Sequence, residues 1–154
     1  MLTLTKDDET GLVVTRLFSA TPQQLWEAHV DPVLIRQWML GPDGWELTRC
    51  DSEGTAGGTI RFDWSNGQGD RLSLTGEIVE ALPPHRMVHV ERMHLPDPTP
   101  DNHVETLIDA EGDGCRLTLI MTLPDARTRD AMLDTGMAEG MEASYARLEA
   151  LIAR

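Results

Sequence analysis

Hydrophobic and polar residues alternate along several short segments of this chain, as they do in β-strands with one buried face. The period is two because successive side chains of a strand point to opposite faces of a sheet. A first strand is predicted over residues 11–19, which read GLVVTRLFS. Six further strands are predicted over residues 45–52, 58–65, 71–82, 86–95, 103–111 and 115–123. Turn sequences separate these six segments and predict consecutive antiparallel strands.

Helical signals interrupt this pattern after the first strand and replace it towards the C-terminus. Thr21 before Pro22, and Asp31 before Pro32, each combine an N-cap side chain with a proline at the first helical position, and they predict two short helices. From residue 125 onward, apolar side chains recur about once per helical turn, at Leu133, Met137, Met141, Tyr145 (or Ser144), Leu148 and Ile152. Leu148, Leu151 and Ile152 near the end of this segment are expected to bury against the sheet. The predicted order is β-α-α-β6-α, an α+β fold with one long amphipathic C-terminal helix.

The length and composition favour a single domain over residues 1–154. A chain of 154 residues with 40% hydrophobic content can bury roughly 70% of the surface of its unfolded form, which is enough for one core. The sequence contains no internal repeat, linker or low-complexity segment. Nothing in the pattern therefore indicates a second domain.

Charge and cysteine content narrow the classes of partner. The chain has 26 acidic and 13 basic residues and a net charge of −13, which repels nucleic-acid phosphates and anionic lipids. No apolar run approaches about 18 residues, and the first residues lack a signal-peptide pattern. Cys50 and Cys115 lie far apart without metal-site spacing, which favours free thiols in a reducing compartment. We expect a soluble, cytoplasmic protein with no nucleic-acid or membrane partner.

Five segments, in this order, resemble the SRPBCC (START-like) superfamily, specifically homologues of the C-terminal domain of the heat-shock-protein ATPase activator. The segments are TRLFSATPQQLWEAHVDPVLIRQWMLGPDGW, GGTIRFDW, TGEIVEALPPHRMV, GCRLTL and GMAEGMEASYARLEAL. The resemblance implies a helix-grip fold, in which a curved antiparallel sheet wraps around the long C-terminal helix and leaves an apolar cavity. The chain departs from many relatives at QWMLGP, where the spacer is longer and contains a methionine.

Strand alternation predicts which side chains face that cavity. The inward residues are expected to be Ile60, Phe62 and Trp64 on one strand and Leu117, Leu119 and Met121 on the last. Either ordinary core packing or contact with a ligand accounts for them, because any sheet needs apolar residues on its buried face.

A second strand face carries polar residues among methionines. Met87, His89, Glu91 and Met93 alternate with outward residues in the segment 86–95. If this face is inward, as the resemblance suggests, His89 and Glu91 must satisfy each other, bind water or meet a polar group of a ligand. If the strand has the opposite register, His89 and Glu91 point to solvent and have no special role. No third histidine or carboxylate has metal-site spacing, and no nucleophile motif is present, so we predict no metal and no catalytic residue.

Two tryptophans flank the turn Gly-Pro-Asp-Gly at residues 41–44. Turn chemistry explains the glycines and the proline but not Trp38 or Trp45. Either the two rings close the end of the core as a hydrophobic plug, or they rim the entrance of the cavity.

The predicted C-terminal helix contains two glycines and several methionines. Gly136 and Gly140 each cost about 1 kcal/mol relative to alanine in a helix, and a close approach of the sheet or a local bend would offset this cost. Met132, Met137 and Met141 suit either an ordinary core or a cavity that adapts to different ligands.

We therefore predict a protein, a monomer or homodimer without cofactor, that binds a small hydrophobic or amphipathic molecule between sheet and helix. The predicted ligand-binding residues are Trp38, Trp45, Phe62, Trp64, Met87, His89, Glu91, Leu119, Met121, Met137 and Met141. The resemblance leaves two alternatives open. One is a co-chaperone-like module with a chaperone partner and a role in stress response, and the other is a cyclase- or aromatase-like enzyme.

Overall fold

The structure is a computed structural model that describes residues 1–41, 43–94 and 99–153, and these residues form eight strands and four helices. The strands are β1 (Thr3–Asp7), β2 (Gly11–Phe18), β3 (Glu46–Ser52), β4 (Thr59–Ser65), β5 (Arg71–Leu82), β6 (Arg86–Met93), β7 (Asn102–Glu111) and β8 (Gly114–Thr122). The helices are α1 (Pro22–Val30), α2 (Pro32–Trp38), α3 (Ala126–Leu133) and α4 (Met137–Ile152). Pro42 of the predicted turn and Leu95 of a predicted strand lie outside the described residues.

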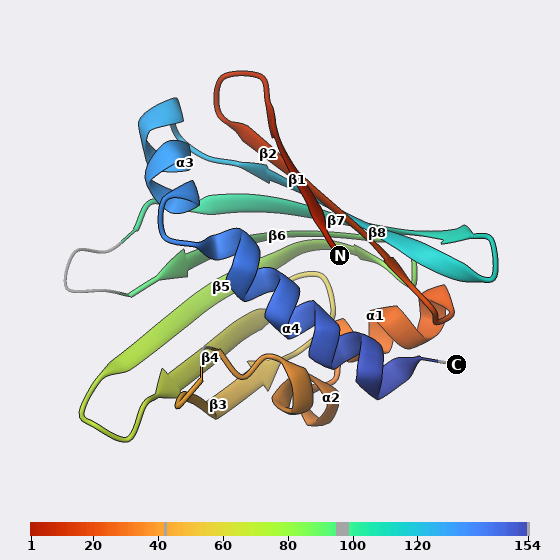
Figure 1. Cartoon of the computed structure of the whole chain (residues 1–154), viewed down its shortest axis with the longest axis horizontal. Helices are drawn as coiled ribbons and strands as arrows, with labels where there is room; N and C mark the ends of the chain where they lie inside the picture. The colour runs from red at the N-terminus through yellow and green to blue at the C-terminus, as the bar shows by residue number, and fades with distance from the viewer. Residues whose placement is uncertain (42, 95–98, 154) are drawn as a thin grey trace.

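The strands form one curved antiparallel sheet that does not close into a barrel, with α4 crossing its concave face (Figure 1). Their order is β1-β2-β8-β7-β6-β5-β4-β3. Strands β3 to β8 pair as a meander, and the pairing of β2 with β8 joins the two ends of the chain. The predicted meander and the α+β helix-grip fold are confirmed.

Strand β1 is an addition to the predicted order. It pairs antiparallel with β2, from Thr3 opposite Thr15 to Asp7 opposite Gly11. Asp8 makes the turn between them with φ of 48°, and its carboxylate accepts hydrogen bonds from the backbone N–H groups of Thr10 and Gly11. Most side chains of β1 are exposed, so the sequence lacks the alternating pattern that identified the other strands.

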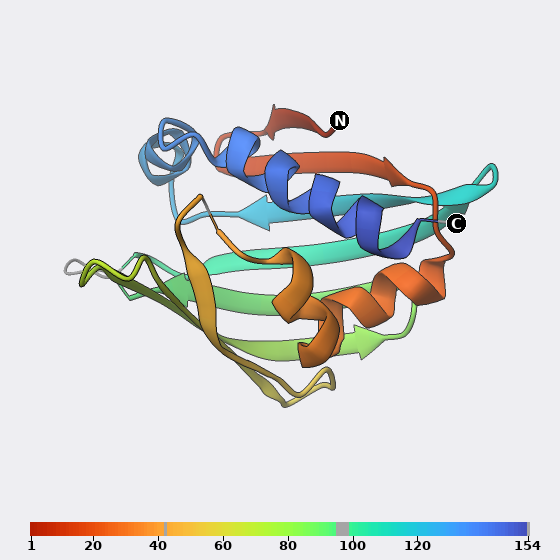
Figure 2. The ribbon, with the colours of Figure 1, turned by 60° about the horizontal axis from the view of Figure 1, so that its bottom comes forward.

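The first two helices begin where their N-cap residues predict. The Thr21 side chain accepts a hydrogen bond from the N–H of Gln24, whose own side chain returns to the Thr21 backbone, forming a capping box. Asp31 caps α2 in the same way through the N–H of Val33. Figure 2 shows α1 and α2 lying beside α4 on the same side of the sheet. The three helices together cover part of its concave face.

The predicted single C-terminal helix is wrong in one respect, because it is divided into α3 and α4. Gly136 is the N-cap of α4 and has φ of +79°, a left-handed conformation that L side chains rarely adopt. Asp134 ends α3 as its C-cap. The glycine therefore permits a change of chain direction between two helices and does not lie within one.

Helix α4 is fixed to β2 by both charge and packing. Arg16 of β2 is only 8% exposed and donates from Nε and Nη2 to the two carboxylate oxygens of Glu142, at 3.1 and 2.9 Å. Tyr145 meets Phe18 of β2 edge-on, with ring centroids 5.8 Å apart. Leu148 is fully buried, as predicted. These contacts hold α4 across one half of the sheet.

Buried residues form two apolar clusters among the described residues. The larger joins β2, β7 and β8 to α1, α2 and α4, while the smaller joins Ile35 of α2 to Leu47, Cys50 and Phe62 of β3 and β4. Cys50 and Cys115 are both buried and unpaired, in different clusters, which confirms the predicted free thiols. Across residues 1–41, 43–94 and 99–153, no helix has the length and apolar character needed to cross a membrane.

Candidate functional site

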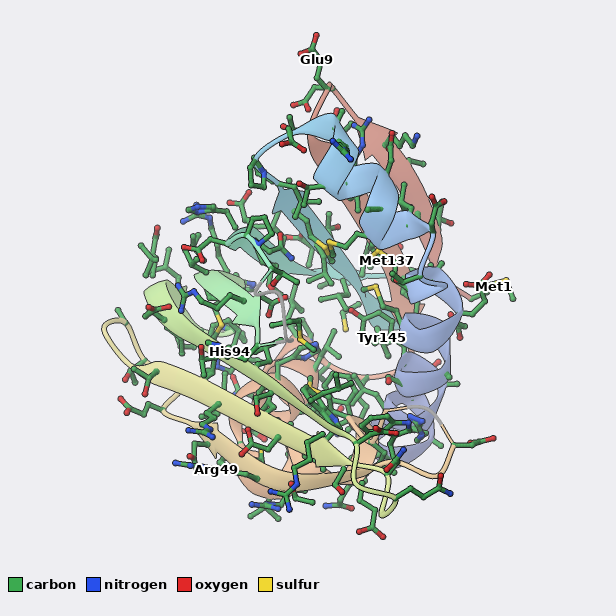
Figure 3. All side chains as sticks on the ribbon, turned by 90° about the vertical axis from the view of Figure 1, so that its left-hand side faces the viewer. Met1, Glu9, Arg49, His94, Met137 and Tyr145 are labelled. Carbon is green, nitrogen blue, oxygen red and sulfur yellow. The ribbon has the colours of Figure 1, made fainter. Side chains whose placement is uncertain are left out.

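A cavity of about 380 Å³ lies between the concave face of the sheet and the helices. Its volume is near the lower end of the range of about 300–1,000 Å³ found for small-molecule sites. Six of the eight methionines line it, namely Met39, Met87, Met121, Met132, Met137 and Met141. Figure 3 shows sulfur atoms, in yellow, gathered near Met137 and Tyr145. Methionine is flexible and polarizable, so this wall can adapt to ligands of different shapes.

Most of the residues predicted to bind a ligand meet at this cavity. Nine of the eleven line it, namely Trp38, Phe62, Met87, His89, Glu91, Leu119, Met121, Met137 and Met141. Trp45 and Trp64 are not among the lining residues. The predicted burial of Leu117, Leu119 and Met121 is confirmed. Contact of any of these residues with a ligand stays a prediction.

Ion pairs on the outer face of the sheet fix the orientation of β6. Arg86 and Arg92 each pair with two carboxylates from neighbouring segments, at N–O distances of 2.6–3.0 Å. These residues hydrogen-bond on the solvent side, so the alternate residues Met87, His89 and Glu91 face the cavity. Of the two registers that the sequence left open, the inward one is present.

Three polar side chains of the cavity wall form a hydrogen-bonded cluster. The Glu91 carboxylate lies 3.0 Å from His89 Nε2 and accepts a longer hydrogen bond, of 3.4 Å, from Asn102 Nδ2. Asn102 lies opposite Glu91 in the pairing of β6 with β7. Two buried atoms of the cluster, His89 Nδ1 and Asn102 Oδ1, have no hydrogen-bond partner among the described residues. An unpaired buried polar atom costs about 1–3 kcal/mol, so these atoms are available to a ligand.

Aromatic rings form another side of the cavity. The Trp38 ring lies 5.2 Å from the His29 ring and stacks on Tyr145 at 6.1 Å. Burial lowers the pKa of His29, and its Nδ1 lies 2.7 Å from the carbonyl oxygen of Leu25, to which it donates. Burial, followed by the negative charge of Glu91, raises the pKa of Tyr145. At neutral pH both side chains are therefore uncharged.

Trp38 and Trp45 differ in whether they close the core or rim the cavity. Trp38 is 3% exposed, and its Nε1 donates to the carbonyl oxygen of Ala28 at 2.9 Å, so it closes the core while its ring forms cavity wall. Trp45 is half-buried beside Gly41, away from the cavity. Trp64 donates to the carbonyl oxygen of Met39 at 3.0 Å and supports the loop after α2. The plug interpretation therefore describes Trp38.

Several lining residues were missing from the sequence prediction. Asn102 was assigned to a loop, although it shares the strand face of Val104 and Ile108 and could have been found by extending the alternation one residue. Tyr145 lies on the predicted apolar helix face, and the apolar pattern does not distinguish a core residue of that face from a cavity-lining one. His29 carries no distinguishing sequence signal, since one histidine on a helix is compatible with many environments. Ile60, predicted to face the cavity, and Met132, predicted to suit a core or a cavity, also line it. The members that the sequence did not indicate are Trp26, Met39, Ser52, Ile78, Val104, Thr106, Ile108, Gly140 and Ser144.

A second cavity of about 590 Å³ adjoins the first beneath α3. The two share Glu91, Asn102 and Met132. The second is more polar at its edge, where Asp125 and Arg127 contribute. The polar cluster therefore lies at the junction of the two spaces. In the described part of the chain, no group of three or more His, Cys, Asp or Glu side chains is placed to hold a metal ion.

The fold and the interior cavity define a helix-grip protein of the α+β class. A family model described as Activator of Hsp90 ATPase homolog 1-like protein matches residues 19–153. The chain therefore belongs to this family. A comparison with curated proteins finds no significant match.

Solved structures of similar proteins agree with this assignment. A crystal structure of a protein from Rhodobacter sphaeroides is 31% identical, with a TM-score of 0.90 over 98% of this chain and 97% of that one. A Mycobacterium smegmatis protein is 22% identical, with a TM-score of 0.86 over 98% and 96% of the two chains. A Staphylococcus epidermidis protein is 21% identical, with a TM-score of 0.84 over 97% and 93%. The last two likenesses support the fold alone.

Proposed function

We propose that this protein binds a small, mostly apolar molecule in the cavity beneath α4. The observation that carries the proposal is an interior space of about 380 Å³ with a methionine-rich wall and two buried polar atoms that lack partners. Small-molecule sites combine the same features, a predominantly apolar surface and a few polar groups that orient the ligand. The nine predicted residues that line the cavity are the proposed ligand contacts, with Asn102 and Tyr145 added.

The proposal is tested by filling the cavity from α4. Gly140 lines the cavity although it is exposed, and a Cβ atom built on it meets nothing within 4 Å, so it lies at the open side of the cavity. Gly140→Leu is therefore expected to place a side chain across the open side of the cavity without disturbing the helix. The matched control is Ala143→Leu, which adds the same side chain at an exposed position of α4.

The measurement is titration with N-phenylnaphthylamine, an uncharged fluorophore that brightens in apolar surroundings. The unmodified protein and Ala143→Leu are expected to bind it with similar affinity, and Gly140→Leu at least about tenfold more weakly, because the added side chain occupies its site. Circular dichroism and thermal unfolding check that both variants fold. Equal binding by folded Gly140→Leu, or no binding by the unmodified protein, contradicts the proposal.

Family membership favours a second candidate, a chaperone-associated role. The family description names an activator of the Hsp90 ATPase, so binding to an Hsp90-type chaperone is the corresponding activity for this chain. Immobilised protein is incubated with a purified Hsp90-type chaperone, and ATP hydrolysis is measured in parallel. A stable complex with altered ATP hydrolysis supports this role. Absence of both effects removes it and leaves the small-molecule role unaffected.

The proposed location is the cytoplasm. Both cysteines are unpaired thiols in the structure, as suits a reducing compartment. Cell fractionation with an antibody to the protein tests this location, and recovery in an exported fraction contradicts it.

A further inference from the structure

The polar cluster of the cavity presents acceptors and few free donors. Asn102 directs its Nδ2 towards the Glu91 carboxylate, because the reversed amide would set two oxygens against each other. Its Oδ1 is then an acceptor, and it is buried without a partner among the described residues. Asn102 as a whole is only 7% exposed. The site therefore has an unused acceptor held in a fixed position.

His89 extends the same arrangement. Its Nε2 lies 3.0 Å from Glu91, and a neutral ring that donates from this nitrogen leaves Nδ1 as a second acceptor. Nδ1 is buried and also lacks a partner in the described part of the chain. Both residues line the cavity with Glu91. A group that carries several N–H donors could bond to all three side chains at once.

Glu91 is the one acidic side chain among the described residues that line this cavity, while Arg92 and Arg127 line the adjoining cavity, where Arg92 pairs with Glu77 and Asp101. Glu91 is a carboxylate, and none of the described lining residues is a lysine or arginine. The arginines behind the wall are engaged elsewhere, since Arg16 pairs with Glu142 and Arg147 donates to the backbone carbonyls of Trp38 and Gly41. His29 adds no positive charge at neutral pH because burial lowers its pKa. The negative charge of Glu91 thus faces the cavity without an arginine or lysine partner.

We infer that the ligand of this cavity carries a protonated amine, which donates hydrogen bonds to Glu91, His89 and Asn102 while its apolar body lies against the methionine wall. The inference rests on the proposed function and specifies the class of ligand. An ammonium group has three donors and no acceptor, which complements two neutral acceptors and one carboxylate. An alcohol has one donor, and a carboxylate adds a second negative charge beside Glu91.

The test compares three probes with the same bicyclic body, naphthylethylamine, naphthylethanol and naphthylacetate. Each is measured by displacement of N-phenylnaphthylamine at neutral pH and low salt. We expect the amine to bind about tenfold more tightly than the alcohol, because its hydrogen bonds are charge-assisted. We expect the carboxylate to bind about tenfold more weakly than the alcohol, because it meets Glu91.

Two isosteric variants test whether the preference for the amine depends on the polar cluster of His89, Glu91 and Asn102. Glu91→Gln is expected to bring the affinity for the amine to within about twofold of the affinity for the alcohol, with both affinities measured against the variant's own affinity for N-phenylnaphthylamine. Glu46→Gln removes the same charge from an exposed position of β3 and is expected to leave the preference unchanged. Thermal unfolding of both variants verifies their folding.

The outcomes separate this inference from the proposed function. If the alcohol or the carboxylate binds as tightly as the amine, the inference is overturned and the cavity remains a site for apolar molecules. If the preference persists in folded Glu91→Gln, the amine lies elsewhere and the inference is also overturned. If the unmodified protein binds neither N-phenylnaphthylamine nor any of the three probes, the proposed function fails together with it.

Discussion

Two glycines four residues apart are expected to respond to alanine in opposite ways. Gly140 is helical and has open space where a Cβ would stand, so Gly140→Ala should raise the free energy of unfolding by about 0.5–1 kcal/mol. Gly136 has φ of +79°, so Gly136→Ala should lower it by about 1–2 kcal/mol. Urea unfolding of both variants measures the effects, and each serves as the control for the other. Two changes of the same sign would contradict the assigned backbone conformations.

His29 is expected to make stability depend on pH below about neutrality. Burial lowers its pKa from 6.5, so the unfolded chain takes up a proton more readily than the folded chain. The stability contributed by the neutral ring is present above pH 6.5 and is lost as pH falls towards the lowered pKa. In His29→Gln, the free energy of unfolding should therefore depend less on pH between 6.5 and about 5.

The control for this prediction is His103→Gln, which changes an exposed histidine of β7. Urea unfolding is measured at several pH values for the unmodified protein and for both variants. His103→Gln should keep the pH dependence of the unmodified protein. An unchanged slope in His29→Gln would show that His29 is not the titrating group.

At the scale of elements, a buried ion pair contributes to the anchoring of α4. The two hydrogen bonds from Arg16 hold the pKa of Glu142 below its usual value. Glu142→Gln leaves the buried guanidinium with one carboxylate among the described residues, Glu149 at 3.8 Å, besides its hydrogen bond to the Leu17 carbonyl oxygen, and should lower the free energy of unfolding by about 2–3 kcal/mol. The matched control, Glu111→Gln, breaks an exposed pair with Arg116 and should cost about 0–1 kcal/mol. Equal losses in chemical denaturation would contradict a special role for the buried pair.

Most helices and strands could be predicted because a local sequence signal marks each of them. Thr21 and Asp31 are caps whose side chains bond to nearby backbone, and the six alternating segments each bury one face. β1 was missed because an exposed edge strand needs no apolar face. The break at Gly136 was missed because apolar residues recur with helical spacing on both sides of it, and that spacing alone does not reveal a change of direction.

The sequence predicted which strand face carries the candidate site residues, but it did not predict the cavity that lies against this face. Alternation put His89 and Glu91 on one side of a strand, but only the surrounding elements determine that this side is inward. The predicted burial of Leu151 was wrong, since it is 37% exposed, because helix phase alone does not tell how far the sheet extends under the last turn. A cavity remains where no side chain fills the space between elements, for example where a Cβ of Gly140 would stand. The spacing of apolar residues along the sequence does not reveal such unfilled space.

For the whole molecule, the end of α4 is expected to be indispensable. A chain that ends at Ala143 loses the buried Tyr145 and Leu148, and each such side chain contributes about 1.5–3 kcal/mol. The loss approaches the net stability of about 5–15 kcal/mol of a typical domain, so cooperative unfolding should disappear. The control chain ends at Ile152 and should retain it. Cooperative melting of the shorter chain near the temperature of the control would refute this expectation.

The pairing of β2 with β8 also has a consequence for synthesis of the protein. Leu12 and Val14 of β2 are almost fully buried, yet their strand pairs with β8, where Gly11 lies opposite Thr122. A ribosome adds about 5–20 residues per second, so the N-terminal hairpin waits roughly 5–20 s before its partner strand has been made. During that interval the edge of β2 that pairs with β8 is unpaired, and its apolar face, which packs against α4, is uncovered. The edge is paired once β8 emerges, but the apolar face stays exposed to aggregation until α4 has also been made.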